Sequence, residues 1–230
     1  MGLTAKAQSD SGQSYDPLPT GIHQAVCIWV IDIGMHEIEW QGNKKLQHKV
    51  MLVWELPALR GDFPNQDGTT SDKPRVISNE YTLSLSEKAN LHKMLVSWRG
   101  KVFTPEELSG FDLKNILGVN CQIQVIHNPS KKDPSKIYAN IANVLPAAAG
   151  APKVEPENKP IFFSFEDHKG EGCPDIPSEI PQWIQDKITK SDTWRMLSNP
   201  QAAVEPAVDL NTSGAIDKEL ADLDSSDIPF

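Results

Sequence analysis

Two short stretches of the chain combine aromatic rings with lysines. The first contains Trp40, Lys44 and Lys45, and the second contains Lys131, Lys132, Lys136 and Tyr138. Aromatic faces stack on nucleic-acid bases, which contributes about 1–3 kcal/mol per base, and ammonium groups pair with phosphates. These residues are therefore candidates for contacts to single-stranded nucleic acid. The alternative is a solvated hairpin tip for the first stretch and an edge-of-core position for Tyr138.

Three further cations are candidates for the same chemistry. Lys49 falls on the polar side of a predicted strand, on the same face as the first stretch. Arg99 and Lys101 follow a predicted helix, where a helix C-terminus also attracts cations without any ligand. Trp54 shares an apolar face and is expected in the core, whereas Trp98 is expected to anchor the helix.

The sequence gives little support for catalysis or metal binding. The six histidines show no H-x-x-x-H or H-x-E spacing, and the three cysteines form no C-x-x-C pair. Neither a phosphate-binding G-x-x-x-x-G-K-[ST] loop nor a G-x-S-x-G nucleophile motif is present. We therefore expect no enzyme activity, no metal and no cofactor, and we expect reduced thiols in a cytoplasmic protein.

Negative charge is distributed unevenly along the 230 residues. The net charge is −9, yet residues 1–150 carry 15 basic and 15 acidic side chains. Residues 151–200 carry 6 and 9, and residues 201–230 carry 1 and 7. The overall acidity therefore does not argue against a nucleic-acid partner for the first 150 residues.

Hydrophobic patterns predict a mainly β fold. Strands are expected at 21–33, 46–56, 75–85, 121–125 and 137–145, with loops at 35–45 and 57–74. The strand at 46–56 alternates apolar and polar residues, which predicts one packed and one wet face. Ser86 is expected to cap a helix that ends at Gly100, and Thr104 to cap a shorter one. A helix between the third and fourth strands favours a five-stranded OB-fold barrel, whose face and loops commonly bind oligonucleotides.

Composition divides the chain into five segments. A flexible N-terminal arm (1–19) precedes the OB-fold domain (20–146), an Ala- and Pro-rich linker (147–160), a small α/β extension (161–199) and a disordered acidic tail (200–230). The extension is too short for an independent core, so it is expected to pack on the barrel or on a second subunit. A homo-oligomer is compatible with this organisation. The chain contains no apolar run long enough for a membrane span.

Several motifs resemble a family of bacteriophage and prophage proteins labelled as single-stranded DNA-binding or replication-initiation proteins. The similar stretches are Trp54-Glu55-Leu56-Pro57, Tyr81 to Lys88, Trp98-Arg99-Gly100-Lys101-Val102-Phe103-Thr104, and Tyr138-Ala139-Asn140-Ile141. Together they span most of residues 20–146. The resemblance implies an OB-like domain that binds DNA, and it does not assign individual contact residues.

The C-terminus resembles the tip of bacterial single-stranded DNA-binding proteins, which recruits replication and repair enzymes. The similar residues are Asp224, Asp227, Ile228, Pro229 and Phe230. The acidic run differs from that of the family because Ser225 and Ser226 interrupt it. The resemblance implies that Phe230 and its carboxylate bind a protein partner.

The sequence therefore predicts a non-sequence-specific single-stranded DNA-binding protein of phage replication or recombination, acting in the cytoplasm of the bacterial host. Its expected partners are single-stranded DNA and, through the tip, replication or recombination proteins. The alternative is an acidic adaptor or DNA mimic that binds host replication proteins without contacting DNA. A mimic should lack the lysine and aromatic clusters near 40–49 and 131–138, so their presence favours DNA binding.

Overall fold

A computed structural model describes residues 16–40, 42–64, 67–130, 133–168 and 172–199. Its elements in chain order are β1 (Gly21–Trp40), β2 (Asn43–Pro64), β3 (Thr70–Thr82), α1 (Asn90–Arg99), α2 (Pro105–Ser109), the 3-10 helix η1 (Leu113–Ile116), β4 (Asn120–Pro129), β5 (Ile137–Pro146), β6 (Ile161–Phe163), α3 (Gln182–Thr189) and α4 (Asp192–Ser198). The predicted mainly β architecture is confirmed.

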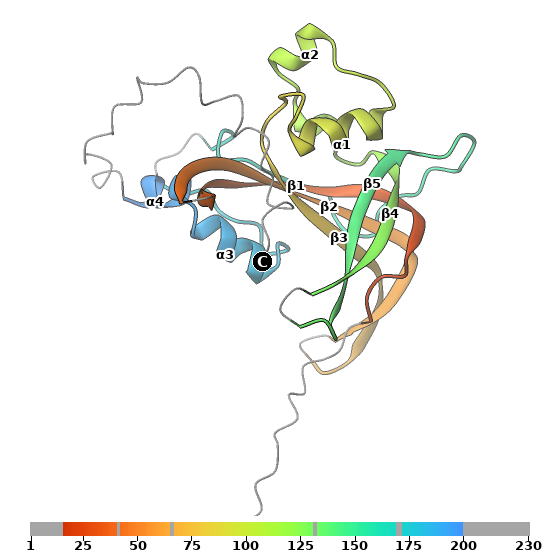
Figure 1. The fold of residues 1–230 in the computed structure, drawn as a ribbon. Coiled ribbons are helices and arrows are strands. Elements are labelled where there is room, and N and C mark those ends of the chain that lie inside the picture. The colour runs from red at the N-terminus through yellow and green to blue at the C-terminus, as the bar shows by residue number, and fades with distance from the viewer. Residues whose placement is uncertain (1–15, 41, 65–66, 131–132, 169–171, 200–230) are drawn as a thin grey trace, which may run out of the picture.

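Five strands form an antiparallel sheet in the order β3-β2-β1-β4-β5, and β6 adds a parallel pairing to β1. Within the described residues no ladder joins β3 to β5, so the sheet is not closed and the predicted barrel closure is not confirmed. The two edge strands nevertheless approach within 8 Å, measured between Cα atoms. In Figure 1, α1 and α2 lie on one side of the sheet, and α3 and α4 lie on the other.

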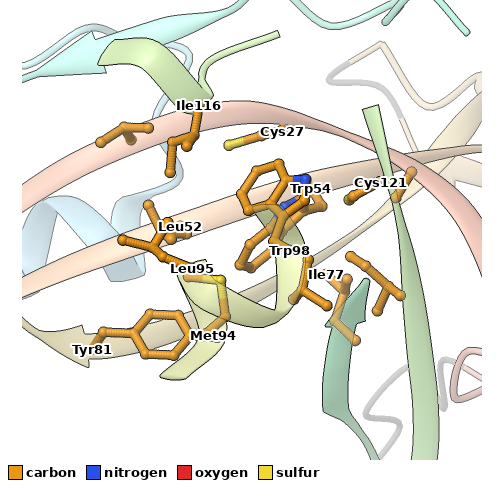
Figure 2. Close-up of a cluster of buried hydrophobic side chains, with 14 of the residues drawn as sticks. Cys27, Leu52, Trp54, Ile77, Tyr81, Met94, Leu95, Trp98, Ile116 and Cys121 are labelled. Carbon is orange, nitrogen blue, oxygen red and sulfur yellow. The ribbon is translucent and has the colours of Figure 1, made fainter. Parts of the chain in front are cut away.

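The first core lies between the sheet and α1. Trp54 of β2 and Trp98 of α1 form its centre, with ring centroids 5.9 Å apart (Figure 2). Both indoles are buried, as predicted, and Leu52 and Leu95 pack beside them. Alternate residues of β2 point into this cluster because successive strand side chains face opposite ways.

A second core lies on the opposite face of the same strands. Here side chains such as Ile31 of β1 and Val53 of β2 pack against Phe163, Ile184 and Ile188 from the C-terminal segment. The expectation of a wet face on β2 is therefore wrong, because β6 and α3 cover it. Since residues 25–34 of β1 are buried on both faces, this part of its sequence is mostly apolar on both faces rather than alternating.

A buried carboxylate fastens the segment before β6 to the sheet. Glu55 is 0% exposed, and its two oxygens accept hydrogen bonds from Glu157 N at 2.8 Å, Asn158 N at 2.9 Å and Asn158 Nδ2 at 2.6 Å. Beside it, Trp29 Nε1 donates to the Lys159 carbonyl at 3.1 Å. Residues 155–160 thus run along the sheet and lead directly into β6.

Strand boundaries differ from the prediction at two polar hairpins. Residues 35–45 continue the ladder between β1 and β2, and most of 57–74 forms a β2–β3 hairpin. Residues 57–64 alternate between half-buried and exposed positions, and Leu59 packs against the first core. The Pro, Gly and Asp residues among them are typical of loops, which is why the sequence predicts a loop there. Pro74 is tolerated because β3 is an edge strand, where a missing N–H interrupts no inner ladder.

Helix ends follow the predicted signals in two of three cases. Thr104 forms a complete capping box with Glu107, and Gly100 ends α1 in the left-handed conformation at φ 66°. Ser86 does not cap α1. The helix begins four residues later at Asn90, with Ala89 at the N-cap.

Replacing Glu55 by Gln should destabilise the fold by about 2 kcal/mol. The amide offers one acceptor oxygen to three donors, and burying an unsatisfied donor costs about 1–3 kcal/mol. Urea unfolding followed by tryptophan fluorescence measures the difference. Glu39→Gln, at an exposed position of β1, is the matched control and should change stability by less than about 0.5 kcal/mol. Equal stability of the two variants would contradict the role of Glu55.

Candidate nucleic-acid interface

The β1–β2 arm carries the first predicted cluster. It runs from Met35, opposite His48, to Trp40, opposite Asn43, and Gly42 takes a positive φ of 81° at the turn. The side chain of Trp40 lies outside what the structure describes. Lys44 is exposed near the end of the arm, and Lys45 is half-buried.

Charges on this arm nearly balance. Lys44 Nζ lies 2.7 Å from Glu37 Oε1, and the hydrogen bond and charge of Glu37 raise the pKa of Lys44, with Glu39 adding to the effect. Lys45, opposite Ile38, is the second cation. The sequence interpretation overlooked the two glutamates, which lie on the same face of the ladder as Lys44 and reduce the attraction of the arm for phosphates.

Lys49 does not occupy the predicted exposed position. It is 1% exposed, and its Nζ donates a hydrogen bond to Thr82 Oγ1 at 3.1 Å. The alternation was assigned correctly, but the face that carries Lys49 is the one that the C-terminal segment covers. Lys49 is therefore a buried polar residue of the sheet and is inaccessible to DNA in this structure.

Arg99 packs between α1 and α2 and makes contacts within the protein. Its guanidinium pairs with Glu107 and lies over the Phe103 ring, 4.2 Å from the centroid, and over the Phe111 ring at 5.2 Å. Its side chain is only 12% exposed. These contacts give Arg99 a structural role, whereas its neighbour Lys101 is exposed.

The β4–β5 hairpin carries the second predicted cluster. Tyr138 is 55% exposed and pairs with Asn128 across the ladder, and Lys136 is exposed at the start of the returning strand. Asp133 shapes the turn by accepting hydrogen bonds from Ser135 Oγ at 2.6 Å and Ser135 N at 3.1 Å. These bonds lower the pKa of Asp133, and the charge of Lys136 lowers it further. Lys131 and Lys132 lie outside the described residues.

Tyr138 belongs to a larger surface, which we call the amide face. It is the outward side of the first residues of β1 together with β4 and β5, where directly paired residues share one side of the sheet. Its members are Ile22, Gln24, Gln122, Gln124, Ile126, Asn128, Tyr138, Asn140, Asn143 and Leu145. Ile22 is 57% exposed, and Asn143 Nδ2 donates to Gln124 Oε1 at 2.8 Å. None of these described members carries a charge.

The sequence contained a signal for the amide face that the interpretation missed. In β4 and β5 the positions that alternate with buried Ile123, Val125 and Val144 are amides and apolar residues rather than the usual charged ones. A solvated strand face without charges is uncommon among exposed positions, where Lys, Glu, Arg and Asp predominate. The face that the OB analogy assigns to oligonucleotides, on the second and third strands, is in contrast partly covered. There Lys187 of α3 bonds Glu80 of β3 at 2.5 Å.

Asp32, Gly34 and His48 form what we call the root of the β1–β2 arm, where the arm leaves the buried part of the sheet. A hydrogen bond between the buried Asp32 and His48 stabilises it. Asp32 Oδ1 accepts a hydrogen bond from Gly34 N at 2.8 Å and lies 2.7 Å from His48 Nε2. The hydrogen bond with Asp32 raises the pKa of His48 against the opposing effect of burial, and the charges of Asp32 and Glu166 add to it. Gly34 takes a positive φ of 82°, and a Cβ there would lie 2.6 Å from Ser191 Oγ, so glycine is required where α4 meets the arm.

The predicted partner-binding residues Asp224, Asp227, Ile228, Pro229 and Phe230 lie outside the described residues. Among the residues that are described, no group of three or more His, Cys, Asp or Glu side chains is placed to hold a metal ion. No helix in that part of the chain is both long and apolar enough to cross a membrane.

Comparison of the chain with protein-family models gives no match, and comparison with curated protein sequences gives none either.

Replacing His48 by Gln should destabilise the protein more in acid than in base. A folded-state pKa above the ordinary value of 6.5 means that the charged pair contributes fully below about pH 6.5 and is lost as the pH rises through the folded value. We expect a loss of about 1 kcal/mol at about pH 5.5 and a smaller one at about pH 9.

Thermal unfolding at both pH values measures this difference. In the Asp32→Asn background, the pH dependence of the His48→Gln effect should become much smaller, because Asp32 is the main partner and only the charge of Glu166 remains. An equal effect of His48→Gln at both pH values in the unsubstituted protein would contradict the charged pair.

Proposed function

We propose that this protein binds single-stranded DNA without sequence specificity, in phage replication or recombination, through an OB-type domain. Three features support an OB-type fold: the strand order β3-β2-β1-β4-β5, a helical segment between β3 and β4, and the approach of β3 to β5. The OB fold is a partly open five-stranded barrel, so an unpaired gap between two edge strands is compatible with it.

The observation that carries the proposal is the amide face with Tyr138 exposed at its end. A half-exposed phenol ring offers a stacking platform for a base, and the side-chain amides of Gln124, Asn140 and Asn143 can both donate to and accept from base edges. Because the face carries no carboxylate, it does not repel a polyanion. Lys136 supplies a cation at its border. The DNA path in this proposal therefore follows β4 and β5 rather than β2 and β3.

The C-terminal tip is the second part of the proposal. Residues 201–230 carry seven acidic side chains and one basic one and end in Ile228-Pro229-Phe230. An apolar ring next to a terminal carboxylate suits a partner pocket that combines an apolar cleft with a cation. Recruitment of replication or recombination proteins by this tip would position them on the bound strand.

Tyr138→Ala should weaken binding to fluorescent oligo-dT by about tenfold or more, since one stacked base contributes about 1–3 kcal/mol. Fluorescence anisotropy at low salt gives the dissociation constants. Trp183→Ala is the matched control, because Trp183 is a 50% exposed aromatic residue of α3 that is not part of the amide face, and its loss should leave the affinity unchanged.

Two results of this titration would count against the proposal. Absence of oligo-dT binding by the full chain at low salt would favour the adaptor or mimic function. If Trp183→Ala weakened binding and Tyr138→Ala did not, DNA binding would stand but the amide face would not be the surface.

Deleting residues 217–230 should tighten oligo-dT binding at low salt and have little effect at high salt. The deleted segment carries a net negative charge and is tethered to the same molecule, so it competes with DNA where screening is weak. Anisotropy titrations over a salt series measure the effect. Phe230→Ala keeps every charge of the tail and should behave as the full chain does. An identical salt dependence for the deletion and the full chain would contradict the competition.

A further inference from the structure

A pocket of about 460 Å³ lies on the side of the arm root that faces the α2–η1 connection. Its apolar wall includes Val30, Val50 and Leu83, and two aromatic rings, Phe111 and Phe162, complete it. The segment after β6 forms the opposite rim. None of the predicted DNA-binding residues whose side chains the structure describes lines this pocket.

Asp32 contributes a buried carboxylate to the pocket. The residue is 7% exposed, and both of its hydrogen bonds, from Gly34 N and with His48, use Oδ1. No described residue donates a hydrogen bond to Oδ2. A carboxylate has about four acceptor positions on its two oxygens, so this group retains acceptor capacity at the pocket wall.

The rim of the pocket is negatively charged. Lys114 Nζ pairs with Asp167 Oδ2 at 2.7 Å, while Asp112 and Glu166 line the pocket without a cation of their own in the described structure. The hydrogen bond from Lys114 to Asp167 raises the pKa of Lys114, with the charges of Asp167 and Asp112 adding to it. The charge of Glu166 acts in the same direction on His48. The electrostatic potential of the pocket therefore favours a positively charged ligand.

The aromatic walls favour cations as well. Lys114 Nζ already lies over the Phe162 ring, 4.6 Å from its centroid. Such contacts contribute about 0.5–2 kcal/mol, more when the cation is shielded from water. A ligand with a flat or slender apolar body and a cationic end would match both the rings and Asp32.

We propose that this pocket binds an organic cation, a guanidinium, amidinium or ammonium group carried on an apolar body. The cationic end would bond to Asp32 Oδ2, and the body would lie between Phe111 and Phe162. Anions are disfavoured by the rim carboxylates, which excludes the DNA backbone and the acidic tail of the chain itself as occupants. The ligand could be a free small amine or a basic side chain of a partner protein, since both present the same chemistry.

Benzamidine is a suitable probe because it joins an aromatic ring to an amidinium. Its nine non-hydrogen atoms at about 0.3 kcal/mol each correspond to a dissociation constant of about 10 mM or tighter. Titration of the full chain, followed by isotope-edited NMR of backbone amides, should shift signals of Phe111, Asp112 and Phe162. Benzamide, the neutral isostere, should bind about tenfold more weakly, because a charged hydrogen bond contributes about 1.5–3 kcal/mol.

Two variants test whether the carboxylates of Asp32 and Glu166 contribute to binding of the cation. Asp32→Asn should weaken benzamidine about tenfold or more, and Glu166→Gln, which removes an exposed rim charge and leaves the arm root intact, should weaken it about two- to fivefold. Glu155→Gln is the control, an exposed acid outside the pocket, and should have no effect. Agmatine and a capped Gly-Arg-Phe-Gly peptide then separate the two ligand sources, since tighter binding of the peptide indicates a protein partner and tighter binding of agmatine a free amine.

The proposal fails if benzamidine and benzamide bind equally, if benzamidine shifts no signal near the pocket at about 10 mM, or if Glu155→Gln and Glu166→Gln have the same effect.

Discussion

The hydrogen bonds accepted by Glu55 join β2 to the segment that leads into β6. A carboxylate that is fully removed from water carries a large desolvation cost, and it persists in a fold only where donors replace the lost water. Here Glu157 and Asn158 supply three donors, two from the backbone. The segment that follows is therefore fixed in direction, and β6, α3 and α4 have one place to pack, the outward side of β1 and β2.

In this arrangement β1 belongs to the middle one of three layers, with α1 on one face and β6, α3 and α4 on the other. The covered part of the sheet is no longer free for a ligand. The covering layer buries Lys49 and occupies part of the side of the sheet where an OB domain would ordinarily hold an oligonucleotide. The uncovered side of β4 and β5 remains, with its amides and Tyr138. A function based on base stacking and amide hydrogen bonds fits that surface better than one based on phosphate pairing, because Lys44 of the β1–β2 arm pairs with Glu37 and lies opposite Glu39.

The sequence predicts the parts of the fold whose stability is local. Thr104 and Gly100 mark helix ends by backbone chemistry that needs no tertiary partner, and alternation identifies the inward residues of β2 such as Trp54. The sequence does not predict the two hairpins, because their faces are at most partly buried and their Pro, Gly and Asp residues are typical of loops. It also does not predict which polar face is covered later in the chain. The positions of Lys49 and Trp29 depend on contacts with residues more than 30 or 100 positions away, which no local pattern encodes.

Backbone amide hydrogen exchange of the full chain, with and without saturating oligo-dT, tests the central claim most directly, because it maps the bound surface without substitutions. We expect slower exchange over β4 and β5, with the greatest change near Asn128 and Tyr138, and unchanged exchange in α3. Protection confined to α3 and α4, or no protection of β4 and β5 under conditions where the oligonucleotide is bound, would contradict this claim.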